Sequence, residues 1–208
     1  MIEEHKRNRL PHWWSAHATY FLTFNLFDAM PSAVAEKLRV ERRIRIAELE
    51  RLRVRATAPE VAAIAAVVRE HAETTLDASH GACFMNDSRV AEIVSTAITH
   101  FDGQRHHLHA WCVMPNHVHV VFEPFDRLDT IVHSWKSFTS KAANAILDRT
   151  GKFWQDDYYD RIIRNENELA RTIRYVLENP LRAGLRDWPW LGERASRPQS
   201  PRVPRGDR

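Results

Sequence analysis

The sequence of 208 residues contains few cysteines and no long hydrophobic run, and both absences limit the kind of protein it can be. Its two cysteines, Cys83 and Cys112, form no Cys-x-x-Cys spacing, so we expect no structural zinc site built on cysteines and a reduced state. No stretch approaches the roughly 18 apolar residues of a membrane span. The first residues, Met1 to Arg7, are not followed by the apolar core of a secretion signal. We therefore expect a cytoplasmic protein without a membrane partner.

A large excess of charge of one sign is also missing. The chain holds 30 Lys and Arg residues against 27 Asp and Glu, a net charge of +3 with neutral histidines, although its pI is near 9.1. This balance favours a polyanionic partner without identifying one. Hydrophobic residues make up 44% and charged residues 27%, which is ordinary for a globular protein. The length suits one well-packed domain with additions, or two small domains.

The first part of the chain predicts one strand and a pair of helices. Residues 13–27 are rich in aromatic and β-branched side chains and predict a mostly buried strand. Amphipathic stretches at about 34–55 and from Pro59 onward predict two helices within residues 31–80. Their alternating charges more often mark a solvated face than a nucleic-acid patch. We expect this helical pair to be an insertion that covers the domain and takes no part in catalysis.

The middle of the chain predicts a helix followed by a hairpin. The helix begins after Asp87, and the strands at 108–113 and 117–122 form an antiparallel hairpin around the turn Met114-Pro115-Asn116. Three histidines at the start of the first of these strands are expected at the surface or at a sheet edge, namely His106, His107 and His109.

Two more helices and an extended segment follow the hairpin. The helix at about 129–147 has a predicted buried stripe that consists of Ile131, Trp135, Phe138, Ala142 and Ala145. Residues 153–164 predict an extended segment, either a strand or a sheet edge. Asn165 followed by Glu168 predicts a capping box at the start of the last helix. We expect that helix to end near Asn179, because a residue before proline avoids the helical conformation.

The stretch from Trp111 to Phe122 carries two histidines separated by one valine, with apolar residues on both sides. Side chains alternate between the two faces of a strand, so His117 and His119 point the same way. Two imidazoles on one face of a strand could hold one divalent metal ion. A strand with two incidental histidines fits the isolated pattern equally well.

The last helix carries residues that would complete such a site. Tyr175 and Asn179 are four positions apart and share one face of the helix. If that face packs beside His117 and His119, one metal ion would meet two imidazoles and one amide oxygen, which suits magnesium or manganese once a phosphate joins. Tyr175, whose phenol has a reference pKa of about 10, would then attack the bound phosphorus and form a phosphotyrosine. Taken alone, Tyr175 also fits a half-buried anchor, and Asn179 fits a plain helix end.

Four blocks of the sequence, taken together and in order, resemble one family. They are Trp111 to His119, Ser134 to Thr139, Phe153-Trp154-Gln155 with Tyr159-Asp160-Arg161, and Tyr175 to Pro180. The chain resembles the REP-associated tyrosine transposases, relatives of the small insertion-sequence transposases that have a His-hydrophobe-His motif and a single tyrosine. The resemblance covers residues of about 13–27 and 80–190, and the stretch at about 31–80 looks like an extension present in only some relatives.

The resemblance implies an α+β fold of the ferredoxin-like type, in which helices pack on one face of an antiparallel sheet. Residues 1–190 would form one domain with the inserted helical pair at about 31–80. Residues 191–208 are basic and rich in proline and arginine, so we expect a disordered tail that could trail along nucleic acid.

The resemblance also implies the roles of the site residues. His117 and His119 would be metal ligands, Asn179 the third ligand and Tyr175 the nucleophile, with Mg²⁺ or Mn²⁺ as the cofactor. The implied activity is cleavage and rejoining of single-stranded DNA near an imperfect palindrome that folds into a hairpin, through a 5′-phosphotyrosine link and a free 3′-hydroxyl. Such a protein would be associated with the nucleoid, and both a monomer and a homodimer are open. The alternative is a domesticated protein that binds palindromic DNA without cutting it.

Basic and aromatic side chains near the predicted site fit a DNA partner. The candidates for phosphate contacts are Lys136, Lys141, Arg161, Arg164, Arg171, Arg174 and Arg182. Trp154, Tyr158 and Tyr159 could stack unpaired bases, and Trp154 and Tyr158 fit a core position equally well. Tyr159 is the second candidate for the nucleophile, ranked below Tyr175 because no polar partner lies one helical turn away. A histidine-triad phosphohydrolase is excluded, since Val121 stands where a third alternating histidine is required.

Overall fold

The computed structural model describes residues 3–5, 12–14, 18–30 and 80–194, together with the single positions 33, 34, 36, 40 and 76. Apart from those positions, the predicted helical pair at 31–80 lies outside the described residues. The same holds for residues 195–208 of the predicted tail. The domain boundaries proposed from the sequence therefore stay predictions for these two stretches.

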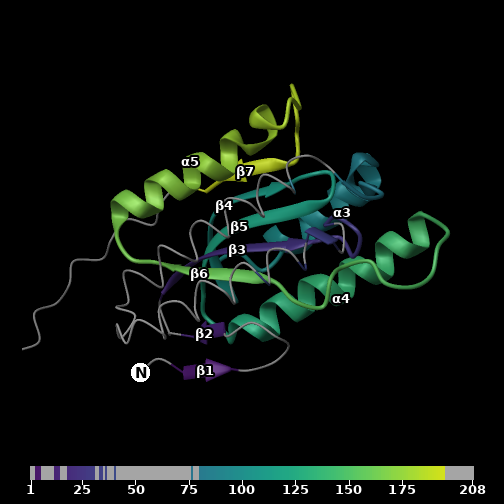
Figure 1. The fold of residues 1–208 in the computed structure, drawn as a ribbon. Coiled ribbons are helices and arrows are strands. Elements are labelled where there is room, and N and C mark those ends of the chain that lie inside the picture. The colour runs from purple at the N-terminus through teal and green to yellow at the C-terminus, as the bar shows by residue number, and fades with distance from the viewer. Residues whose placement is uncertain are drawn as a thin grey trace, which may run out of the picture.

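A five-stranded antiparallel sheet organises the described part of the chain (Figure 1). Its strand order is β6-β3-β5-β4-β7, and a separate pair, β1 (Glu3–His5) and β2 (His12–Trp14), lies at the N-terminus. The strands of the large sheet are β3 (Thr19–Asn25), β4 (His106–Val113), β5 (His117–Pro124), β6 (Tyr159–Ile163) and β7 (Leu191–Glu193). The predicted strand at 13–27 thus corresponds to β3 and part of β2, and the predicted hairpin is β4 and β5.

Helices α3 and α4 connect β3, β4, β5 and β6 in the order expected for a ferredoxin-like unit. After β3 comes the short 3₁₀ helix η1 (Phe84–Asn86) and then α3 (Ser88–Thr99), whereas α4 (Leu128–Ile146) joins β5 to β6. The first four strands of the unit lie side by side as β6-β3-β5-β4, which is the arrangement of a split β-α-β motif. The predicted α+β class with an antiparallel sheet is confirmed.

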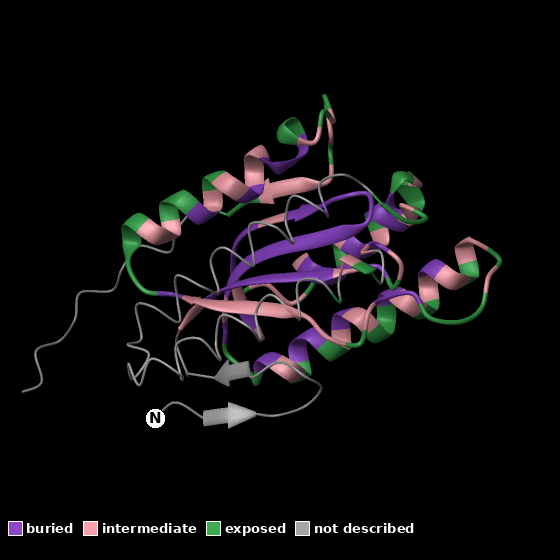
Figure 2. Ribbon diagram, in the orientation of Figure 1, coloured by how far each residue is buried: buried purple, intermediate pink, exposed green. Residues whose placement is uncertain are grey.

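The two faces of the sheet are covered by different helices. Tyr20, Leu22 and Phe24 of β3 pack with α3 and α4, while the alternate residue Phe21 packs with Val176 of α5 (Glu166–Arg182). Figure 1 shows α4 and α5 on opposite sides of the sheet, and Figure 2 shows the central strands buried along their length. The prediction that helices pack on one face therefore holds for α3 and α4. Helix α5 lies on the other face, because the central strands are apolar on both sides.

The predicted start of α3 after Asp87 and the capping residue predicted for α5 are confirmed, but the predicted end of α5 is wrong. Asp87 accepts a hydrogen bond from the Arg89 backbone N–H (3.0 Å), and Asn165 accepts one from the Glu168 N–H (2.9 Å). Helix α5 continues through Pro180 to Arg182. Proline removes one donor from the last turn. That turn is still closed by the Ala183 N–H, which donates to the Asn179 carbonyl oxygen (3.0 Å).

The predicted buried stripe of α4 is correct in its first half only. Ile131 and Trp135 are buried, but the Phe138 side chain is 59% exposed, and its place is taken by Thr139 and Ala143. The Thr139 hydroxyl accepts a hydrogen bond from the Trp154 indole N–H (2.8 Å). Thr139, which has a hydrogen-bond partner in the core, thus occupies the buried position, and Phe138 lies at the surface.

The histidines at the start of β4 are not all surface residues, as the sequence had suggested. His106 is fully buried, and its Nε2 lies 2.9 Å from the carbonyl oxygen of Ile98. His109 is 8% exposed and stands at an irregularity in the pairing between Leu108 and Ala110. A bulge of this kind re-aims side chains, which an alternating pattern does not predict.

Strand β7 occupies three residues that the sequence analysis assigned to the tail. Gly192 pairs with Trp111 of β4, and a Cβ atom at Gly192 would lie 2.3 Å from the Trp111 ring. Only glycine fits there, so the strand depends on the absence of a side chain rather than on an apolar pattern. The Trp190 carbonyl oxygen and the Trp188 indole N–H add hydrogen bonds to the backbone of Val113, both short (2.8 and 2.7 Å).

Candidate active site

Both histidines of the His-x-His pattern lie on the sheet face that α5 covers. Thr23 of β3 is paired with His119 of β5, and Asn25 is paired with His117. Thr23 is also paired with Tyr159 of β6, so Tyr159 stands in the same row of side chains as His119. Strand alternation thus places the pair as the sequence predicts.

The two imidazoles face each other at close range in the interior of the protein. Both side chains are fully buried, and their Nε2 atoms are 3.1 Å apart. Two nitrogens that share one metal ion at about 2.1 Å each, with an angle between about 90° and 110°, are about 3.0–3.4 Å apart. The observed separation therefore fits two ligands of a single metal ion.

A neighbouring polar side chain orients each imidazole through its other nitrogen. The Asn116 amide oxygen lies 2.7 Å from His117 Nδ1, and the Thr23 hydroxyl lies 2.8 Å from His119 Nδ1. Contacts of this type fix the ring orientation of metal-binding histidines. The sequence analysis missed both residues. Asn116 was interpreted as a turn residue only, and Thr23 carries no signal until the strand register is known.

Burial keeps both histidines neutral. Desolvation lowers the pKa of His117 well below its ordinary value of 6.5, with a further contribution from His119. Desolvation alone lowers the pKa of His119 to about 3. At neutral pH both rings therefore keep a lone pair that can bind a cation.

Helix α5 brings Tyr175 to this face, and the buried Asn179 lies one turn further along the same helix. The Tyr175 ring centroid lies 5.5 Å from that of His119 and 6.0 Å from that of Phe21. The guanidinium of Arg182 lies 5.4 Å from the centre of the Tyr175 ring. Tyr175, the histidine pair and the Arg182 guanidinium thus lie around one short stretch of the sheet.

The amide of Asn179 is the most unusual polar group at the site. Its side chain is fully buried, and neither amide atom has a hydrogen-bond partner among the described residues. A buried amide without a partner costs about 1–3 kcal/mol, which binding of a ligand atom would offset. Within the described ranges, no three His, Cys, Asp or Glu side chains are grouped as metal ligands. Among the described residues, the amide oxygen of Asn179 is therefore the candidate for a third protein ligand beside the histidines.

The predicted phosphate contacts are divided between the two sides of the sheet. Arg171 and Arg174 are exposed on α5, and Arg164 is exposed just before it. Lys141 is exposed on α4, which covers the opposite face of the sheet. The structure therefore does not bring all the predicted residues into one basic track.

Two of the predicted DNA contacts are already used inside the protein. The Lys136 ammonium donates to the carbonyl oxygens of Gln155 (2.5 Å), Asp156 (3.1 Å) and Asp157 (3.2 Å). Arg161 of β6 is paired with Glu168 and also donates to the Thr172 hydroxyl (3.2 Å).

The aromatic residues predicted to stack bases also separate into two groups. Trp154 is buried with the α3 and α4 side of the core, and Tyr158 packs against the same cluster. Burial raises the pKa of the Tyr158 phenol, with nearby Asp160 adding to the effect. Tyr159 lies on the α5 side, in the row of His119.

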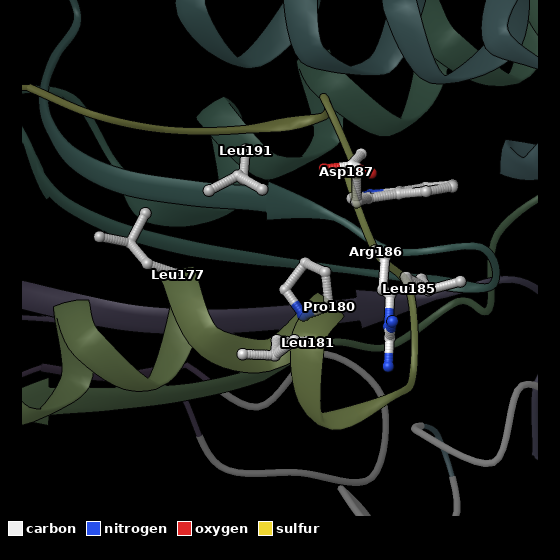
Figure 3. Close-up of a pocket in the computed structure, with 8 residues that line it drawn as sticks. Leu177, Pro180, Leu181, Leu185, Arg186, Asp187 and Leu191 are labelled. Atoms are coloured by element: carbon white, nitrogen blue, oxygen red, sulfur yellow. The ribbon is translucent and has the colours of Figure 1, made fainter.

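A hollow of about 510 Å³ lies between the end of α5 and β7 (Figure 3). It is lined by Leu177, Pro180, Leu181, Leu185, Arg186, Asp187, Trp188 and Leu191. This lining includes no histidine or tyrosine and is mostly apolar, so we do not place the chemistry there.

Among the described helices, none combines the length and apolar character that crossing a bilayer requires.

Comparison with known proteins finds similarity over the part of the chain that carries the site. Residues 83–179 match the family described as "Transposase IS200 like". Over this segment, a little under half of the chain, the sequence is similar to IS200-like transposases. The matched segment begins before α3 and ends at Asn179, so it contains His117, His119 and Tyr175 as well.

Two curated relatives of the IS200-like segment carry a more specific name. The REP-associated tyrosine transposase of Escherichia coli (strain K12) is 24% identical over 87 residues, which cover 40% of this chain and 52% of the relative. A protein of Haemophilus influenzae (strain ATCC 51907 / DSM 11121 / KW20 / Rd) with a provisional form of that name is 25% identical over 97 residues, 39% of this chain and 55% of the relative. The chain spans about half the length of the curated relatives it matches.

A solved structure extends the similarity in fold to most of the chain. The REP-associated tyrosine transposase bound to a REP hairpin has a TM-score of 0.51 and 16% sequence identity, covering 89% of this chain and 82% of that chain. At this identity the likeness shows a shared fold.

Proposed function

We propose that this chain is a metal-dependent endonuclease and strand transferase that acts on single-stranded DNA at hairpin-forming palindromic repeats. The observation that carries the proposal is the placement of the Tyr175 ring against His119, while His119 Nε2 faces His117 Nε2 at 3.1 Å. The family match and the hairpin-bound relative support the choice of DNA as the substrate.

In this proposal Tyr175 is the nucleophile. Its phenol oxygen forms a bond to phosphorus as the bond from phosphorus to the 3′ oxygen of the preceding nucleotide breaks. The phenol loses its proton, and the departing 3′ oxygen takes one up to become a hydroxyl. The product is a 5′-phosphotyrosine, which conserves the energy of the phosphodiester so that a second 3′-hydroxyl can reverse the step.

His117, His119 and the Asn179 amide oxygen would hold one divalent cation. When bound, such a cation polarises the phosphoryl oxygen and stabilises the charge that develops on it. The two imidazoles are borderline nitrogen donors, and only the amide oxygen is a hard donor, whereas Mg²⁺ prefers oxygen alone. We therefore expect Mn²⁺ to support the reaction better than Mg²⁺.

The test uses Tyr175→Phe, with Tyr159→Phe as the matched control, because Tyr159 stands in the same row of the sheet as His119. Each protein is incubated with a hairpin oligonucleotide carrying a single-stranded 5′ flank, in the presence of Mn²⁺ or Mg²⁺. The covalent protein–DNA adduct is then quantified on a denaturing gel. We expect the adduct to disappear in Tyr175→Phe and to persist in Tyr159→Phe, while both variants still bind the hairpin.

Each other outcome has a definite meaning. Loss of the adduct only in Tyr159→Phe would transfer the nucleophile to β6 and refute the assignment of Tyr175. Hairpin binding without an adduct in the unmodified protein, with either metal, would favour a domesticated protein that binds palindromic DNA and does not cut it.

A further inference from the structure

The side chain of Asn116 connects the histidine pair to a distant part of the chain. Its amide oxygen lies 2.7 Å from His117 Nδ1. Its amide nitrogen donates to the carbonyl oxygens of Leu76 (3.1 Å) and His80 (3.0 Å). Asn116 is fully buried, so water does not compete for these bonds. One carboxamide therefore makes three directed contacts.

These contacts determine which way the amide points. The two carbonyl oxygens can only accept hydrogen bonds, so the NH₂ group must face them and the amide oxygen must face His117. An amide oxygen can only accept, so His117 Nδ1 must carry the ring proton. In the neutral ring, His117 Nε2 is then the nitrogen with the free lone pair.

The contacts of His119 restrict its tautomer less than those of His117 do. Since His117 Nε2 accepts, His119 Nε2 is the donor across the 3.1 Å contact, and His119 Nδ1 accepts from the Thr23 hydroxyl. A hydroxyl both donates and accepts, so Thr23 can follow a change of tautomer in His119. The amide of Asn116 cannot do so without turning over and losing its bonds to Leu76 and His80.

We infer that Asn116 is a positioning residue that sets the tautomer of His117 and links the Leu76–His80 end of the preceding stretch to the metal site. In naming the ligand as a metal ion, the inference rests on the proposed function. If Leu76 and His80 move away, the amide is free to turn and present its N–H groups to His117. The ring proton would then shift to Nε2 and block the nitrogen that faces the cation. By linkage, a cation bound at His117 favours the docked position of Leu76 and His80.

Three variants separate these roles. Asn116→Asp keeps an acceptor for His117 Nδ1 but loses both donors to Leu76 and His80. Asn116→Leu has a similar volume and loses both functions. Asn86→Leu makes the same change at an exposed asparagine and serves as the control.

The first readout is the ¹⁵N shift of the His117 ring nitrogens in protein free of metal and DNA at pH 7.5, assigned with His117→Gln. We expect the Nδ1–H tautomer in the unmodified protein, Asn86→Leu and Asn116→Asp, and the Nε2–H tautomer or a mixture in Asn116→Leu. The second readout is Mn²⁺ affinity, measured from the EPR signal of free Mn²⁺. We expect a loss of about 10- to 100-fold in Asn116→Leu and a smaller loss in Asn116→Asp.

Hydrogen exchange tests the link to Leu76 and His80. Mn²⁺ should slow the exchange of the backbone amides of Leu76 and His80 in the unmodified protein and should have no such effect in Asn116→Leu. Unchanged exchange in the unmodified protein would overturn the link.

An Nε2–H tautomer of His117 in the unmodified protein would overturn the inference by itself, even if Asn116→Leu failed to fold. Unaltered tautomer and Mn²⁺ affinity in a folded Asn116→Leu would do the same. Because the tautomer is measured without DNA, its outcome is independent of the Tyr175 adduct on which the proposed function depends.

Discussion

At the scale of single residues, Lys136 joins two of the motifs on which the family resemblance rests. The lysine belongs to the motif in α4, and the three carbonyl oxygens it contacts belong to the loop that leads into β6. Burial lowers the pKa of Lys136 to about 8, which means that desolvation disfavours its charged form. The hydrogen bonds to the three carbonyl oxygens offset this loss of hydration. The residue therefore holds the loop that positions Tyr159.

We predict that Lys136→Met lowers the free energy of unfolding by about 1–3 kcal/mol, because three carbonyl oxygens of the loop lose a charged donor. The matched control is Lys141→Met, an exposed lysine on the same helix, for which we expect a change within about 0.5 kcal/mol. Urea denaturation of both variants measures the difference. Equal effects would show that the Lys136 contacts contribute nothing to stability.

The buried histidines make stability depend on pH. Desolvation, assisted by His107, lowers the pKa of His109 to about 4, and burial also lowers the pKa of His106. In the unfolded chain these groups have pKa values near 6.5. Between about pH 6.5 and 4 the unfolded state binds more protons, so stability must fall as the pH falls through this range.

We predict that unfolding free energy drops between pH 7.5 and 5.5, with about 1 kcal/mol of the drop due to His109. His109→Gln should flatten the pH dependence by that amount, whereas exposed His133→Gln should not. Urea titrations at the two pH values measure the slopes. An unchanged slope in His109→Gln would show that His109 is already protonated, or exposed to water, in the folded state.

At the scale of elements, Glu168 links the start of α5 to β6. Glu168 accepts from the Arg164 backbone N–H (2.9 Å) and is paired with Arg161, whose guanidinium also lies 5.6 Å from the centre of the Phe21 ring. The predicted capping box is thus half present. The backbone of Glu168 bonds to Asn165, but its carboxylate reaches across to the strand instead of returning to the cap. This link sets the start of the helix that carries Tyr175.

We predict that Glu168→Ala lowers the unfolding free energy by about 1–3 kcal/mol, because a hydrogen-bonded charge pair is broken. The control is Glu166→Ala, also in the first turn of α5 but exposed, which should cost only about 0.5 kcal/mol through the helix dipole. Thermal and urea unfolding compare the two. If both variants lose the same small amount, the pairing with Arg161 does not anchor the helix.

At the scale of the whole molecule, the exposed arginines of α5 flank the proposed site on the solvent side. Arg171 and Arg174 are exposed, and they share their helix with Tyr175 and Asn179. Phosphate contacts of this kind release counterions, so they make affinity depend on salt. The division of the predicted basic residues between two faces makes α5 the stronger candidate for the DNA track.

We predict that Arg171→Gln and Arg174→Gln each weaken hairpin binding at every sequence. Each change should reduce the slope of log affinity against log salt by about 1. Arg89→Gln is the control, because Arg89 lies on α3, which packs on the other face of the sheet. Fluorescence anisotropy across a salt series measures the slopes. A reduced slope in Arg89→Gln and none in the α5 variants would place the DNA on the wrong face for this proposal.

The sequence predicted the elements that depend on local patterns. The hairpin, the start of α3 and the start of α5 follow from alternation and capping residues, and the side on which His117 and His119 lie follows from their spacing of two. What it could not predict depends on contacts between distant segments. The face covered by α5, the exposure of Phe138 and the pairing of Gly192 with Trp111 are decided by packing that no single stretch contains.

Some residues of the candidate site could likewise be predicted from the sequence, and others could not. Tyr175 and Asn179 could be paired from their spacing on one helix, and the family resemblance joined them to the histidines. Asn116 and Thr23 could not be found, because their partners depend on strand register and on residues that lie far away in the sequence. Both tyrosine candidates lie on the α5 side of the sheet, Tyr159 in the row of His119 and Tyr175 beside the His119 ring, so spacing alone does not decide between them.

The most direct test of the central claim is to identify the tyrosine that becomes bonded to DNA. The unmodified protein is incubated with Mn²⁺ and a hairpin oligonucleotide, the DNA is trimmed with nuclease, and proteolytic peptides are sequenced by tandem mass spectrometry. We predict a nucleotide attached through its 5′-phosphate to Tyr175, in the peptide that also contains Asn179. A nucleotide on Tyr159, or on no tyrosine while the DNA is cut, would contradict the account.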